Sequence, residues 1–241
     1  MIIRRPRTER LSPRDRTMPD GQQARGEAVL RAALSKKLEV FGDEEEPFVQ
    51  SLRVLKDALH IHEDAQVVYP GSSTHVGVAR VFGKECVTHV DPEDEACSVL
   101  KNAGYTAEAI GIEDYHPKEP ADLMVALNSY GEPTAKMLKN VLKPGGLVIT
   151  NNYTHWATEL SAIEGVTLQS AMLPDYRSGN AELVDSARVP KNATEIVEQE
   201  FVITRGGRML PYEPGERAEG LVTSISSPRY PDALFVFRAA R

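Results

Sequence analysis

A chain of 241 residues suits one large domain, or one domain with appendages. Its apolar fraction of 41% is ordinary for a soluble globular protein, and no apolar run is long enough to span a bilayer, so no membrane partner is expected. A net charge of -7 at pH 7 argues against a main body that lies along the phosphates of a nucleic acid.

The N-terminus carries charge with no apolar stretch behind it, so the sequence predicts no secretory signal and a cytoplasmic protein. Cys86 and Cys97 have no spacing typical of a metal or redox site, and we expect free thiols. His60 and His62 do not define a metal site either, and we interpret His89 as a histidine packed in the core.

Residues 1–25 are rich in arginine and proline and have no hydrophobic period, which predicts a disordered basic arm. A tether for nucleic acid or another anionic partner is the alternative interpretation of this arm. Residues 26–63 are expected to form N-terminal helices, over 27–41 and 43–60, because apolar residues recur there at helical spacing.

Residues 64–172 alternate between strands and helices, which predicts a Rossmann-like α/β domain with a mainly parallel sheet and helices on both faces. Strands are expected at 67–69, 86–90, 105–110, 123–127, 147–150 and 166–172, and helices at 74–82, 92–103, 133–142 and 156–163. Thr74 is the expected N-cap of the first of these helices, and Gly83 and Gly104 are expected to end the first two.

The pattern changes in residues 173–241, where an antiparallel, loop-rich extension is expected to complete the sheet and shape the acceptor side. Residues 201–204 and 208–210 are expected to pair as a hairpin around two glycines. Further strands are predicted at 221–225 and 233–237, with a loop over 226–232.

Three features of the middle region coincide: a glycine turn after the first strand, Asp91 at the end of the second, and Leu-Lys-Pro-Gly-Gly-Leu-Val-Ile over 142–149. Together they resemble the class I, Rossmann-like S-adenosylmethionine-dependent methyltransferases, over about residues 64–172. The 142–149 run is the most specific part. Its physical role is to end a helix, turn through a left-handed glycine and enter a buried strand, so it marks the fold and not the chemistry.

The family's first motif is an acid, any residue, and then Gly-x-Gly-x-Gly. Tyr69 stands at the acid position here, and Gly71, Ser73 and His75 stand at the glycine positions, so only the first glycine matches. The resemblance implies that Tyr69, Gly71, Ser72 and Ser73 contact the cofactor. Two interpretations stay open: a modified cofactor site, or a fold that has lost its cofactor and uses this turn only to begin a helix.

The resemblance assigns Asp91 to the ribose hydroxyls, and the spacing from Gly71 is the one at which an acid meets a ribose. The alternative role of Asp91 is to cap the helix that Pro92 begins. An acid after the third strand lies near the adenine in the family. The simplest alignment places Ile112 there, and Glu113 or Asp114 serves if the loop shifts; the alternative for both is a solvated acidic loop.

Candidate catalytic residues follow the fourth and fifth strands. In the family the end of the fourth strand faces the transferred methyl group, which assigns Asn128 and Tyr130 to the reaction and Asn128 also to the cofactor. His155 follows the fifth strand and is the best general-base candidate, because the usual pKa of histidine lies near neutrality. The alternative for this cluster is helix capping by Asn152 or Thr154.

The resemblance implies an S-adenosylmethionine-dependent methyltransferase of unknown acceptor, with a small molecule favoured. Methyl transfer depends mainly on aligning a nucleophile with the methyl group, so no catalytic triad is required. The alternative is a non-catalytic binding or scaffold protein of the same fold. NAD-dependent oxidoreduction is disfavoured, because residues 71–76 lack the Gly-x-Gly-x-x-Gly spacing.

Overall fold

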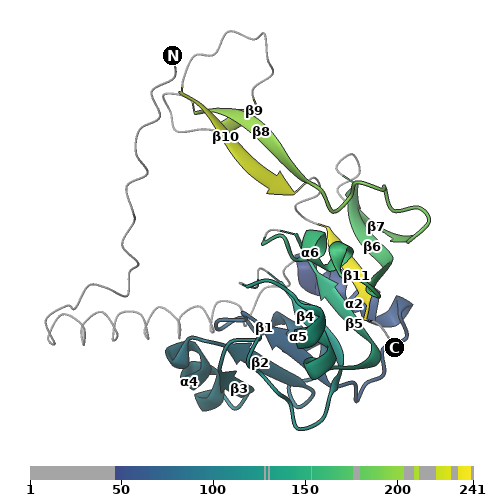
Figure 1. The fold of residues 1–241 in the computed structure, drawn as a ribbon. Coiled ribbons are helices and arrows are strands. Elements are labelled where there is room, and N and C mark those ends of the chain that lie inside the picture. The colour runs from purple at the N-terminus through teal and green to yellow at the C-terminus, as the bar shows by residue number, and fades with distance from the viewer. Residues whose placement is uncertain are drawn as a thin grey trace, which may run out of the picture.

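The computed structural model describes residues 47–127, 129, 131–152, 154–175, 180–203, 209–211, 221–228 and 233–239. The expected arm over 1–25 and the expected helix over 27–41 lie outside these residues. Eleven strands of the described chain form two sheets, one of eight strands and one of three (Figure 1). No described helix is long and apolar enough to cross a membrane.

The larger sheet has the strand order β3-β2-β1-β4-β5-β11-β6-β7. Its parallel strands are β1 (Val67–Pro70), β2 (Val87–Asp91), β3 (Thr106–Ala109), β4 (Ala121–Ala126) and β5 (Leu142–Thr150). The antiparallel strand β11 (Leu234–Arg238) lies between β5 and β6 (Thr167–Asp175), and β7 (Asn180–Asp185) pairs with β6 at the edge. This arrangement confirms the expected α/β, Rossmann-like fold.

Helices cover both faces of this sheet. They are α2 (Pro47–Ala58), α3 (Gly77–Phe82), α4 (Asp94–Asn102), α5 (Ala135–Val141) and α6 (Trp156–Ala162). Val67 of β1 packs in one core with Leu52 and Leu55 of α2, whereas its neighbour Val68 packs in another core with Leu138 of α5. Successive side chains of a strand point to opposite faces, so β1 is buried on both sides, as the central strand of a parallel sheet requires.

Helices α3 and α4 begin two or three residues later than expected. The N-cap of α3 is Val76, with no side-chain cap bond, so the prediction that Thr74 caps this helix is wrong. The N-cap of α4 is Glu93, so Asp91 does not cap it at that position and Pro92 lies outside the helix. Gly83 directly follows α3 as its C-cap with φ of +94°, which confirms that prediction. The C-cap of α4 is Ala103, so Gly104, predicted at that position, lies one residue later, with φ of +79°.

The Lys-Pro-Gly-Gly run lies inside β5, which begins at Leu142 and not at Leu147. Ala121 of β4 pairs with Leu142, but Leu123 pairs with Leu147, so the run forms an irregular segment in this ladder. Gly145 has φ of +78°, which confirms the expected left-handed glycine.

The smaller sheet has the order β10-β8-β9 and extends away from the larger one in Figure 1. Its strands are β8 (Ile196–Ile203), β9 (Met209–Pro211) and β10 (Leu221–Pro228). Pairing of β8 with β9 confirms the expected antiparallel pairing of these two strands, and the predicted glycine turn between them lies outside the described residues. Ser226 to Pro228 pair with β8, so the loop predicted to begin at residue 226 is wrong there. Of the strands after β6, β7 and β11 complete the larger sheet and the other three do not.

Candidate functional site

The turn after β1 requires a glycine at its first position. Gly71 has φ of +63°, and a Cβ atom at this position would lie 2.9 Å from the Cα atom of Ser129. Its N–H donates to the carbonyl of Val90 at 2.8 Å, and the Ser129 hydroxyl donates to the carbonyl of Pro70 at 2.7 Å. The ends of β1, β2 and β4 therefore meet at Gly71.

Asp91 joins the turn after β1 to the turn after β2. Its Oδ2 atom accepts the N–H of Ser73 at 2.7 Å, and its Oδ1 atom accepts the N–H of Glu93 at 2.9 Å. Ser73 has φ of +46°, a left-handed conformation that costs a serine more than a glycine. The buried carboxylate of Asp91 thus holds the non-glycine turn in its strained shape.

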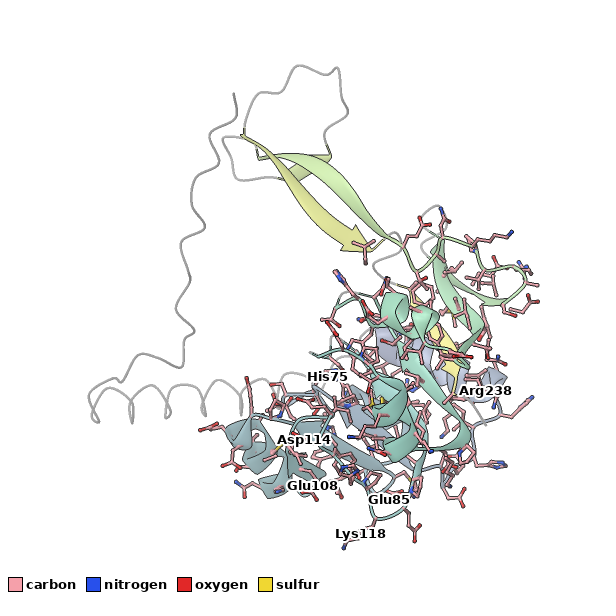
Figure 2. All side chains as sticks on the ribbon, in the orientation of Figure 1. His75, Glu85, Glu108, Asp114, Lys118 and Arg238 are labelled. Carbon is pink, nitrogen blue, oxygen red and sulfur yellow. The ribbon has the colours of Figure 1, made fainter. Side chains whose placement is uncertain are left out.

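These residues lie where the strand order of the sheet changes direction. From β1 the chain moves outward through β2 and β3, and it then continues on the other side of β1 with β4 and β5. Ligands of open α/β sheets bind at this point, beyond the carboxyl ends of the strands. Figure 2 shows His75 at this end of the sheet, whereas Glu85 and Lys118, which precede β2 and β4, lie at the opposite end.

Tyr69 and His75 bond to one another across the turn. The Tyr69 hydroxyl oxygen lies 2.8 Å from Nδ1 of His75, and the two rings meet edge to face with centroids 5.8 Å apart. Burial, with a smaller contribution from Arg80, lowers the pKa of His75 from 6.5 to about 4. His75 is therefore neutral at pH 7. These are the two residues at which the turn differs most from the motif that it resembles in sequence.

His89 on β2 extends this polar group into the core. Its ring lies 5.6 Å from that of Tyr69 and 5.7 Å from that of Tyr105, measured between centroids. It is fully buried, and neither ring nitrogen has a hydrogen-bond partner among the described residues. Burial lowers its pKa from 6.5 to about 4, with a smaller contribution from His75. The interpretation of His89 as a packed core histidine is confirmed.

The structure brings some of the other expected site residues to this edge. Ser72 is buried in the turn, and its hydroxyl is 3.4 Å from the carbonyl of Ser73. Glu113 and Asp114 are exposed in the turn that follows β3, and Ile112 beside them is buried in the core. Asn128 and Tyr130 lie outside the described residues.

His155 is exposed directly before α6, with φ of +68° and no side-chain bond to the helix. Asn152 makes the bonds at this helix start. Its Oδ1 atom accepts the N–H of Thr158 at 3.0 Å, and its Nδ2 atom donates to the carbonyl of Thr194 at 2.9 Å. The hydroxyl of Thr154 is buried with no partner among the described residues, so Asn152 and not Thr154 has the capping role.

Ser129 and Trp156 also shape this edge, and the sequence did not indicate either role. The Trp156 indole N–H donates to the carbonyl of Gly131 at 2.9 Å, which ties α6 to the segment after β4. Both side chains are fully buried. Contacts of this kind join segments that are distant in sequence, so the sequence alone does not identify them. The one hint was that Ser129 follows a strand whose end was expected at the same edge of the sheet as the glycine turn.

The described residues contain no candidate metal-binding cluster. No group of three or more histidine, cysteine, aspartate or glutamate residues is placed to hold a metal ion in that part of the protein. Cys86 and Cys97 are buried free thiols, as expected.

No protein-family model and no curated protein matches this sequence. A SAM-dependent O-methyltransferase from Thermotoga maritima aligns over 86% of this chain and 71% of its own, with 11% identity and a TM-score of 0.41. A SAM-dependent methyltransferase from Thiobacillus denitrificans, in complex with S-adenosyl-L-homocysteine, aligns over 55% and 53%, with 17% identity and a TM-score of 0.35. YjhP from E. coli aligns over 45% and 49%, with 14% identity and a TM-score of 0.36. The chain spans about half the length of the last two proteins.

Proposed function

We propose that this protein is an S-adenosylmethionine-dependent methyltransferase, with the cofactor over the turn after β1 and a small molecule as the favoured acceptor. One observation carries the proposal: Asp91 is bonded to the Gly71–Ser73 turn at the point where the strand order changes direction. An acid and a tight turn at that place suit a nucleoside ligand.

The residues at the edge fit such a ligand. Each carboxylate oxygen of Asp91 accepts one backbone N–H and retains the capacity to accept a second hydrogen bond, which a ribose hydroxyl supplies. Gly71, Ser72 and Ser73 present the backbone of the turn to the same ligand. Glu113 or Asp114 lies on the adenine side, in the exposed turn after β3.

When bound, the cofactor supplies an electrophilic methyl group on a sulfonium sulfur. The protein's contribution is to align the acceptor with that methyl group and to exclude water. Asn128 and Tyr130 follow β4 and orient the acceptor in this proposal. His155 follows β5 and receives the proton that the acceptor loses, through an exposed imidazole that the helix start does not use.

A non-catalytic protein of the same fold is the second candidate. It is favoured by the internal bonds of the turn, where Tyr69 bonds to His75 and Ser129 bonds to Pro70. In that candidate these contacts replace those to a cofactor.

Binding separates the two candidates. The full chain is titrated by calorimetry with S-adenosylmethionine, S-adenosylhomocysteine and NAD, and we expect the first two to bind. Asp91→Asn is expected to weaken both by about tenfold or more, because a charged acceptor is lost. The control is Glu85→Gln at the opposite end of the sheet, which should bind like the unmodified chain.

Thermal unfolding of both variants shows whether Asp91→Asn retains its fold. Absence of binding heat with unmodified protein at millimolar ligand would reject the methyltransferase proposal and leave the non-catalytic candidate.

A further inference from the structure

The turn after β1 offers no charge to an amino-acid group. An α-ammonium group carries a full positive charge and three donors, and a carboxylate is its strongest partner. Residues 69–75 contain no acid, and Ser129, at the facing end of β4, is uncharged. Among the described residues, Asp91 is the carboxylate bonded to this turn, and it reaches the turn from β2.

Two hydroxyl groups at this place, those of Tyr69 and Ser129, bond to the protein itself. The Tyr69 side chain stands where a methyltransferase of this type carries an acid, but its hydroxyl bonds to His75 and the residue is 3% exposed. The Ser129 hydroxyl is fully buried and donates to the carbonyl of Pro70. Within residues 69–75 and at Ser129, a ligand above the turn therefore meets backbone and uncharged side chains.

His75 offers no positive charge to the α-carboxylate of an amino acid. Its imidazole is neutral at pH 7, so it offers no full positive charge to an α-carboxylate. The nucleoside half has a different environment, because Asp91 closes β2 with a carboxylate that can accept ribose hydroxyls.

We infer that this site recognises the nucleoside and thioether parts of its ligand and gains little affinity from the amino-acid end. The site would thus accept adenine nucleoside 5′-thioethers as a class, with S-adenosylhomocysteine as one member. The inference rests on the proposed function, since it concerns the same cofactor site.

The test compares two ligands that share the nucleoside and the sulfur. The full chain is titrated by calorimetry with S-adenosylhomocysteine and with 5′-methylthioadenosine, which lacks the amino-acid end. We expect dissociation constants within about fivefold of one another, because a charge-assisted contact to the amino acid would separate them by about tenfold or more. A larger preference for S-adenosylhomocysteine overturns the inference and leaves the proposed function intact.

Tyr69→Phe is the matched variant, because it keeps the buried ring and removes the hydroxyl. We expect it to leave the ratio of the two dissociation constants unchanged. Selective weakening of S-adenosylhomocysteine by this variant would also overturn the inference, because the hydroxyl would then contact the amino-acid end. If neither ligand binds the unmodified chain, the inference fails together with the proposed function.

Discussion

His89 is the least satisfied side chain of the described core. Its imidazole lies on a central strand between two tyrosine rings, and neither nitrogen is bonded within the described chain. A buried polar group without a partner costs about 1–3 kcal/mol of stability. An aromatic ring without nitrogens would fill similar space at no such cost.

We predict that His89→Phe raises the free energy of unfolding by about 1 kcal/mol at pH 7. The substitution should also make the free energy of unfolding depend less on pH below pH 6.5. The pKa of His89 is 6.5 in the unfolded chain and about 4 in the folded one, so between these values the unfolded state binds an extra proton. Stability therefore falls as pH drops from 6.5 to 4, by up to about 1.4 kcal/mol per pH unit for this residue.

Urea unfolding at several pH values measures both effects. The pKa of His75 is lowered in the same way, so part of the slope should remain in the variant. A variant that is less stable at pH 7, or that keeps the whole slope, would contradict the prediction.

Ser73 gives a second prediction at this scale. Its φ of +46° suits a glycine, so Ser73→Gly should raise the free energy of unfolding by about 0.5 kcal/mol, net of the extra freedom that glycine gives the unfolded chain. Ser72→Gly is the control, because Ser72 is not among the residues with positive φ and this change should lower stability. Equal losses in both variants, measured by urea unfolding, would show that the turn is not strained at Ser73.

Single residues of this turn were only partly predictable from the sequence. The need for Gly71 followed from the motif, and the structure supplies its cause in the close approach of Ser129. The bond between Tyr69 and His75 did not follow, because a six-residue separation across a turn has no fixed geometry. The motif comparison registered these two residues as mismatches, and the structure shows them as a pair.

At the scale of elements, the start of α6 depends on one amide. Asn152 is fully buried and connects the N–H of Thr158 in α6 to the carbonyl of Thr194 in the segment before β8. The segment that contains Thr194 also places Val189 and Ala193 in the core. Asn152 therefore fixes both the helix and the segment that covers it.

We predict that Asn152→Ala lowers the free energy of unfolding by about 1.5 kcal/mol, because the N–H of Thr158 loses its acceptor and the carbonyl of Thr194 keeps only the Thr158 hydroxyl as a donor. Ser161→Ala is the control on the same helix: its hydroxyl donates to the carbonyl of Ala157 one turn earlier and makes a long, exposed contact of 3.3 Å with the Thr194 hydroxyl, so its loss should cost about 0.5 kcal/mol or less. The chain has a single tryptophan, buried Trp156, whose fluorescence reports the unfolding of this region. Equal effects of the two substitutions would contradict the prediction.

The type of each element, helix or strand, was predicted more reliably than the residues at which it begins and ends. The strands and helices of residues 64–172 all occur, because their apolar patterns and glycine stops are strong local signals. Helix starts were wrong where a residue suited to capping has another bond: Asp91 bonds to Ser73 and Glu93 and not to the start of α4 at the N-cap position. Strand β7 was missed, since its sequence gives no clear alternation.

At the scale of the whole molecule, the strands after β6 fall into two groups. Strand β11 pairs on both sides within the larger sheet, and Phe235 and Phe237 are fully buried there. Strands β8, β9 and β10 pair with one another in a separate sheet. The sequence predicted antiparallel strands for this region but not this division, because alternation does not identify the partner of a strand.

We predict different outcomes for two deletions. Replacing residues 196–228 with a flexible glycine-serine linker should leave a cooperative thermal transition and native Trp156 fluorescence, because the larger sheet keeps all its strands. Removing residues 234–238 should abolish that transition, because β5 and β6 lose their shared partner and two buried phenylalanines. The same outcome for both deletions would show that the two sheets do not unfold separately.

The position of β11 also has a consequence for how the protein is made. Synthesis runs from the N-terminus, so β5 and β6 emerge long before the strand that separates them. Until β11 follows, both present open backbone edges, and the smaller sheet is made during this interval. The nascent chain therefore passes through a stage in which β5 and β6 can pair with a strand other than β11. The native pairing forms late, because β11 is distant from both strands in sequence.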